Sequence, residues 1–133
     1  MAGFKIAGVT EEGNCEHCGA ACPKRRMLVV PIDAEGNAAG PAQSWGVVCA
    51  AKVRAGKVRV GKAESDSLWK FAAAVERVRK AVSRWDGTGN LDSIVSAAML
   101  LGLPFEIRGG VVRMWADRVR GSAPAAEIVV ASN

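Results

Sequence analysis

The feature that most constrains this chain is a pair of cysteines, Cys15 and Cys18, which are separated by two residues and followed by Gly19. Two intervening residues let both thiolates turn inward onto one ion, and the glycine permits the tight backbone turn of a zinc knuckle. The sequence therefore predicts a small metal-bound finger over residues 15–49, with zinc as the metal.

The compartment that we expect for the chain supports metal ligation over a disulfide. The start of the sequence shows no secretory signal, and no apolar run approaches the roughly 20 residues that a membrane-spanning helix needs. We therefore expect a cytoplasmic protein without a membrane partner. In a reducing compartment, clustered cysteines are more often metal ligands than disulfides.

A tetrahedral site needs two further ligands. Cys49 lies beyond a predicted hairpin, where a finger would supply its far ligand from the start of a helix. Cys22 is the choice for the remaining ligand by residue type and proximity. His17 is its rival, although the knuckle turn would point it outward because it lies between two ligating cysteines. The alternative for any of these cysteines is burial as a small hydrophobic residue.

An iron–sulfur cluster is the alternative cofactor. The spacing Cys15-x2-Cys18-x3-Cys22-Pro23 matches the last three cysteines of a bacterial ferredoxin run, and Cys49 could complete four thiolates. The residues between these cysteines are charged or polar, and a second cluster motif is missing. Both observations favour zinc.

Four segments together resemble small treble-clef zinc-finger proteins of bacteria and their phages. They are residues 4–10, the knuckle 15–19, the basic and apolar run 24–29, and Gly46-Val47-Val48-Cys49-Ala50. The resemblance covers about residues 4–55 and implies a short strand, a knuckle, a hairpin and a helix that starts at Gly-x2-Cys-Ala. It implies a fold and a metal more than a function. Cys22 departs from the pattern, because many such proteins show only three obvious cysteines.

The first half of the chain is predicted to form short elements. We expect strands over 4–10 and 27–32, a hairpin loop over 33–41, a return strand over 43–48, a short helix from 49 to 53 and a strand-like segment over 57–60.

The second half changes to helical periodicity. Ser65 or Asp66 can cap a helix because a short side-chain oxygen satisfies exposed backbone N–H groups. Its apolar side chains recur every three or four residues and form one face: Leu68, Phe71, Val75, Val78, Val82 and Trp85. Residues 86–89 should end this helix. A second helix should follow, capped by Asn90 and stopped by Gly102 and Pro104.

A C-terminal hairpin is predicted around Gly109-Gly110, a good two-residue turn because both positions need positive φ. In that register Ile107 faces Val112, Phe105 faces Met114, and Glu106 forms an opposite-charge pair with Arg113. Residues 121–124 read as a linker, and residues 127–130 as either disordered or an added edge strand.

These elements predict an α+β protein in which a treble-clef-like finger precedes two helices and a hairpin. We divide the chain into a zinc-finger module at 1–62, a helical and hairpin unit at 63–120, and a tail at 121–133. The second unit should cover the apolar helix face with Ile94, Ala98, Phe105, Ile107, Val112 and Met114. If that face were exposed, it would instead support a helix-mediated homodimer.

Positive charge gathers with the cysteines. Residues 1–63 hold nine Lys and Arg against five Asp and Glu, whereas residues 64–133 hold nine against eight. Two clusters carry the excess, and they consist of Lys24, Arg25, Arg26 and of Lys52, Arg54, Lys57, Arg59, Lys62. A rigid finger could present both to nucleic acid or to an acidic protein surface. The alternative is that these side chains serve solubility alone.

Two other groups are read chiefly as structural. Lys70, Arg77 and Arg84 fall seven apart, which is typical of the wet side of an amphipathic helix. Trp85 continues the apolar stripe, whereas Trp69 lies off it and is the better candidate for a contact surface.

Composition gives little support for catalysis. The chain has one histidine, no clear nucleophile motif, no phosphate loop and no paired carboxylates. We therefore expect a zinc-binding regulatory or adaptor protein that contacts nucleic acid. A protein-interaction module, such as a phage factor that engages a host protein, is the alternative, and a metal-dependent or redox enzyme ranks last.

Overall fold

The computed structural model describes residues 3–10, 15–16, 26–35, 37–85, 92–99, 102–116 and 124–130. Within these residues the chain has three helices and two small antiparallel sheets. The predicted α+β class is therefore confirmed. The predicted second-helix cap Asn90, the helix stop at 86–89 and the start of the linker at 121–123 lie outside the described residues.

The first sheet has the order β1-β2-β3, with β1 at Gly3–Thr10, β2 at Arg26–Ile32 and β3 at Gln43–Gly46. Side chains alternate between buried and half-buried along β1 and β2, as expected for a sheet with one face on a core. The register of β1 against β2 shifts between Ile6 and Gly8, which marks a bulge. The β2–β3 hairpin confirms the predicted loop and the predicted start of the return strand at Gln43.

Helix α1 (Val47–Ala55) begins directly after β3. The predicted return strand was two residues too long, because Val47 and Val48 belong to this helix despite their preference for strands. Val47, Ala50 and Ala51 are buried, and this three-four spacing places them on one helix face. Packing of that face therefore overrides the local preference.

The strand predicted over 57–60 is wrong. Those residues lie in a six-residue connection, 56–61, between two helices. The side chain of Val58 is 87% exposed.

Helix α2 (Lys62–Arg84) starts earlier than predicted, with Gly61 as its N-cap. Ser65 lies inside the helix, where its hydroxyl donates to the carbonyl of Lys62 at 3.0 Å, so the predicted cap was wrong. The apolar face predicted for this helix is confirmed, because its five side chains before Trp85 are all buried: Leu68, Phe71, Val75, Val78 and Val82. Trp85 is half-buried and ends the helix.

The C-terminal half comprises α3 (Asp92–Ala98), β4 (Phe105–Arg108), β5 (Val111–Met114) and β6 (Ala126–Val129). The predicted β4–β5 register is confirmed at each of its pairs. Gly109 and Gly110 have φ of 62° and 74°, and Arg113 approaches Glu106 at 3.8 Å. Strand β6 pairs with β5, so the tail adds an edge strand.

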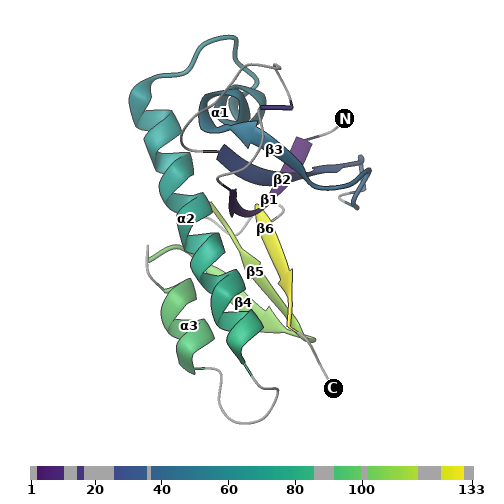
Figure 1. Ribbon diagram of the computed structural model, residues 1–133, viewed down its shortest axis with the longest axis vertical. Helices are drawn as coiled ribbons and strands as arrows, with labels where there is room; N and C mark the ends of the chain where they lie inside the picture. The colour runs from purple at the N-terminus through teal and green to yellow at the C-terminus, as the bar shows by residue number, and fades with distance from the viewer. Residues whose placement is uncertain are drawn as a thin grey trace.

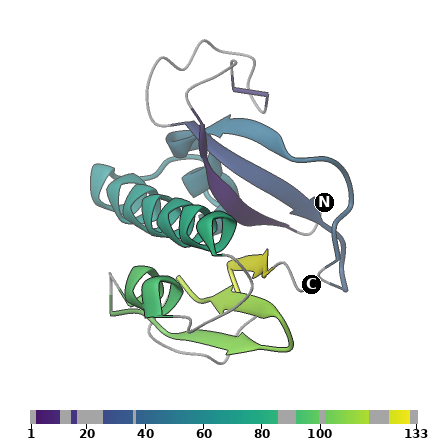
Figure 2. The same ribbon diagram turned by 60° about the horizontal axis from the view of Figure 1, so that its bottom comes forward.

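Helix α2 is the long helix that runs past both sheets (Figure 1). The first sheet lies against its upper part, whereas α3 and the sheet of β4, β5 and β6 lie toward its lower end (Figures 1 and 2). The N–H of Ile6 donates to the carbonyl of Ala125 at 2.8 Å, and Lys5 forms an ion pair with Glu127. These contacts join the two sheets.

Buried side chains from both sheets and all three helices form one cluster. The six residues predicted to cover α2 all belong to that cluster or pack against it. The apolar face of α2 is thus covered within one chain and is not available for a helix-mediated homodimer.

Candidate metal centre

Cys15 occupies a fully buried position at the start of the predicted knuckle. The next residue, Glu16, is fixed to β3 at Ser44 by two hydrogen bonds. The N–H of Glu16 donates to the Ser44 carbonyl at 2.7 Å, and the Glu16 carboxylate accepts from the Ser44 N–H at 2.6 Å. Both backbone groups of Ser44 therefore hold the knuckle entrance against the first residues of β3.

Cys49 is the third residue of α1 and is half-buried. The helix N-cap is Gly46, which makes no side-chain cap hydrogen bond, and the first turn carries no acidic residue. The positive end of the helix dipole therefore favours a negative group such as a thiolate at this position. Cysteine binds a metal as the thiolate, so an environment that favours negative charge at Cys49 also favours ligation there.

The other predicted ligands, Cys18 and Cys22, and the rival His17 lie outside the described residues. Among the residues that the structure describes, no group of three or more His, Cys, Asp or Glu side chains is placed to hold a metal. The four-cysteine set needs two undescribed ligands, so it stays a prediction. The donors that are described, one buried and one half-buried thiol, fit a thiolate metal such as zinc.

The second cationic cluster lies where α1 ends and α2 begins. We call Lys52, Arg54, Lys57, Arg59 and Lys62 the basic end. Lys52 is half-buried, and the other four are exposed. Lys57 lies 3.7 Å from Glu64 in an exposed ion pair, which is worth little in water. Of the first cluster, Arg26 begins β2 beside Gly46, whereas Lys24 and Arg25 lie outside the described residues.

A helix-ending turn fixes the geometry of the basic end. Gly56 takes φ of 65°, and its N–H donates to the carbonyl of Val53 at 3.2 Å. The N–H of Lys57 donates to the carbonyl of Lys52 at 3.1 Å. This pair of bonds is the Schellman motif, and it ties the two lysines together through their backbones. Residues two apart on a helix point in different directions, so Lys52 and Arg54 present their charges on different sides.

The residues predicted to form the wet side of the helix are exposed, as expected: Lys70, Arg77 and Arg84. Trp69, the candidate for a contact surface, is half-buried and packs against the core. Trp69 therefore exposes less of its ring for contact with a partner than the sequence suggested.

Sequence reasoning missed a partly buried ion pair within α2, between Glu76 and Arg79, that lies close to Gly8 of β1. Arg79 donates from Nε and Nη2 to the two carboxylate oxygens of Glu76, each at 2.7 Å. The Glu76 side chain is only 9% exposed. Hydrogen bonding to this carboxylate holds the pKa of Arg79 above its usual value. The (i, i+3) spacing of opposite charges was the available signal, but it is also typical of exposed helix pairs.

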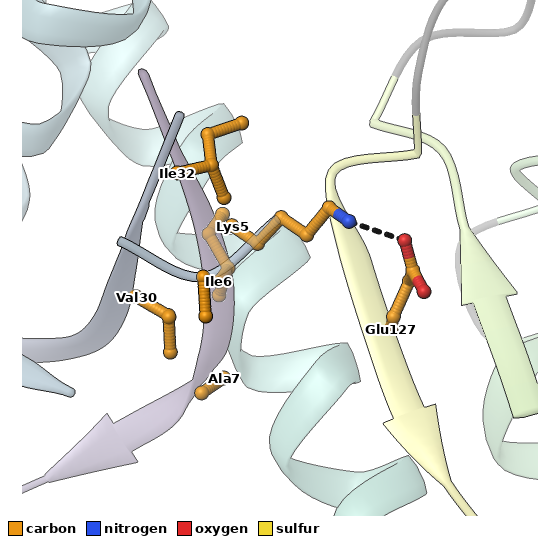
Figure 3. Close-up of a pocket in the computed structure, with 7 residues that line it drawn as sticks. Lys5, Ile6, Ala7, Val30, Ile32 and Glu127 are labelled. Atoms are coloured by element: carbon orange, nitrogen blue, oxygen red, sulfur yellow. Dashed lines mark hydrogen bonds and ion pairs between the residues drawn. The ribbon is translucent and has the colours of Figure 1, made fainter. Parts of the chain in front are cut away.

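A small pocket opens beside β1 and β2 on the face where Lys5 pairs with Val30 (Figure 3). Its volume is about 170 Å³, and apolar side chains line it together with the Lys5–Glu127 ion pair. Small-molecule sites usually span roughly 300–1,000 Å³. This pocket has the size for one side chain rather than a nucleotide or cofactor.

No known family model or curated protein matches the sequence, and no solved structure matches the fold. Within the described ranges, no helix has both the length and the apolar character to cross a membrane.

Proposed function

We propose that this chain is a small zinc-stabilised regulatory or adaptor protein of the cytoplasm that contacts nucleic acid through its basic end. The metal would be held by Cys15, Cys18, Cys22 and Cys49, in the manner of a treble-clef finger of bacterial or phage type. We propose that it acts by binding rather than by catalysis.

The observation that carries the proposal is the placement of Cys15 and Cys49 around one hairpin. Glu16 ties the knuckle entrance to Ser44, and only four residues separate Ser44 from Cys49 in the first turn of α1. Knuckle, hairpin and helix start thus follow in the order in which a treble clef presents its near and far ligands. The position of Cys49 in the first turn of α1 supports metal binding, because a helix N-terminus favours the thiolate form.

Metal analysis of the purified protein tests the centre. We expect about one zinc per chain, as a closed four-ligand site holds, and we expect Cys49→Ser to lose most of it. Val48→Ser is the matched control, because it places the same hydroxyl one residue away at a half-exposed position and keeps every cysteine. A protein without metal, or one containing iron with a visible chromophore, would contradict the zinc proposal.

A second candidate function is protein interaction, in which the zinc is purely structural. One observation favours it. Leu28, Val30 and Ile32 are half-buried on the face of β2 opposite the core, and the small pocket opens on that face. Apolar pockets of side-chain size often anchor a partner residue in protein interfaces. Loss of partner capture by Val30→Asp is the measurement that tests this candidate.

A further inference from the structure

The aromatic rings of this chain are used for internal packing. The sequence contains four Trp, three Phe and no Tyr, and the structure describes all seven rings. Four rings are buried, namely Phe4, Trp45, Phe71 and Trp115. The other three are half-buried and pack against the core, namely Trp69, Trp85 and Phe105.

Trp45 is an example of a ring whose faces and N–H group are used in internal contacts. It is 2% exposed, and its indole N–H donates to the Gln43 side-chain oxygen at 2.9 Å. Its ring meets Phe4 edge-on, with centroids 5.2 Å apart. A base could stack on Trp45 only after this packing was broken.

This packing bears on which nucleic acid the basic end can hold. Proteins that bind single strands combine a cationic groove with aromatic rings on which bases stack, and each stacked base contributes roughly tenfold or more in affinity. Cations alone contact phosphates. A duplex carries one phosphate charge per roughly 1.7 Å of its axis, about twice the density of one strand, so it gains more from cations alone.

The basic end offers several exposed cations to phosphates. The Schellman turn fixes Lys57 next to the last turn of α1, and Arg59 and Lys62 follow on the exposed connection and the first residue of α2. The start of α2 adds the positive end of a 23-residue helix to the same region, and it is partly offset by Glu64 in the first turn of α2 and by the negative end of α1. Charge is therefore concentrated on a backbone anchored by two helices.

We propose that the basic end binds the phosphate backbone of a nucleic-acid duplex and discriminates against single strands. This inference rests on the proposed function, and it adds the form of the partner. It requires contact with phosphates only, so it predicts no choice of sequence.

Fluorescence anisotropy with the zinc-loaded protein tests the inference. The probes are a labelled 20-base-pair DNA duplex, its labelled single strand and an RNA duplex of the same sequence, each titrated at several salt concentrations. We expect the DNA duplex to bind at least about tenfold more tightly than the single strand, the equivalent of one stacking contact that the protein does not supply. The RNA duplex separates a preference for DNA from a preference for any duplex.

Paired substitutions locate the contact. Arg59→Ala with Lys62→Ala removes two cations of the basic end, and each lost phosphate contact should reduce the slope of log affinity against log salt by about 0.9. Arg77→Ala with Arg84→Ala removes the same charge from the exposed face of α2 and should leave the slope unchanged.

Each outcome decides a different point. Equal or tighter binding of the single strand would overturn the duplex inference while leaving the proposed function intact. An equal loss of slope in the Arg77 and Arg84 variant would overturn the assignment to the basic end. No binding of any probe at low salt would overturn the proposed function itself.

Discussion

Replacing Gly8 by alanine should destabilise the fold more than any other glycine-to-alanine change that we compare. Gly8 lies at the β1 bulge with φ of 153°, a conformation that residues with a side chain rarely adopt. An alanine Cβ there would stand 3.2 Å from Glu76 Oε1 and 3.3 Å from Arg79 Nε. The Glu76 side chain is largely buried and accepts two hydrogen bonds from Arg79, so it has little room to move away.

Two costs add at this position. The unfavourable φ costs about 1–3 kcal/mol, and displacing a charged, hydrogen-bonded pair costs about 1–2 kcal/mol more. We therefore expect the free energy of unfolding to fall by about 3 kcal/mol. For a chain of this length that lowers the melting temperature by about 10 °C.

Urea and thermal unfolding, followed by circular dichroism, measure this loss. Gly56→Ala is a control for backbone strain alone, since its φ is 65° and no atom lies within 4 Å of the added Cβ; it should cost about 1–2 kcal/mol. Gly40→Ala has open space and no positive φ, so it should be nearly neutral. In a Glu76→Ala background, Gly8→Ala should cost only its backbone share. An equal cost in both backgrounds would refute the proposed contact.

Two further substitutions test the core and the alternative surface. Val78 is fully buried on α2, so Val78→Asp should lower the free energy of unfolding by more than about 4 kcal/mol and unfold the protein in a thermal melt. Arg77→Asp, at the exposed neighbouring position, should change that free energy by less than about 1 kcal/mol. Similar melting curves for the two variants would refute the assigned helix face. If the outer face of β2 is an interface, Val30→Asp on that half-buried face should abolish capture of a protein partner. Lys5→Ala is a milder change at the same pocket. Unchanged capture by the Val30→Asp variant would exclude this surface.

The elements that could be predicted from the sequence are those set by local rules. The β4–β5 register followed from Gly109-Gly110, because a two-residue turn with positive φ at both positions leaves a single pairing of the flanking residues. The apolar face of α2 followed from its three-four spacing. Both patterns depend on residues close together in sequence, so neither required knowledge of the rest of the fold.

The errors lie where distant segments decide the outcome. Packing of Val47 against the core turned the end of a predicted strand into helix. Lys62, Ala63 and Glu64 all tolerate a helix well, so α2 extends back to Gly61 rather than starting at the polar caps. The contact of Gly8 with Glu76 and Arg79 joins residues about 70 positions apart, and no periodicity in the sequence marks it.

The contacts around the candidate centre could not be predicted from the sequence. The placement of Cys49 in a first helical turn agrees with the Gly-x2-Cys-Ala pattern. Nothing in the sequence indicates the two hydrogen bonds between Glu16 and Ser44, because Glu16 is one polar residue between two cysteines. The basic cluster was found from charge alone, but the turn at Gly56 that orients it requires the observed end of α1.

The proposed metal site and part of the basic end are linked because α1 carries residues of both. Cys49 lies in its first turn, and Lys52 and Arg54 lie in its last. Cys15 belongs to the same buried cluster as Val75 in the middle of α2. Ligation of Cys15 and Cys49 would therefore hold the N-terminal end of α1 against the core. The Schellman turn directs the C-terminal end of α1 into the connection 56–61. A bound zinc ion would then act on nucleic-acid binding without touching the nucleic acid, by fixing the helix that carries Lys52 and Arg54 and leads into the rest of the basic end.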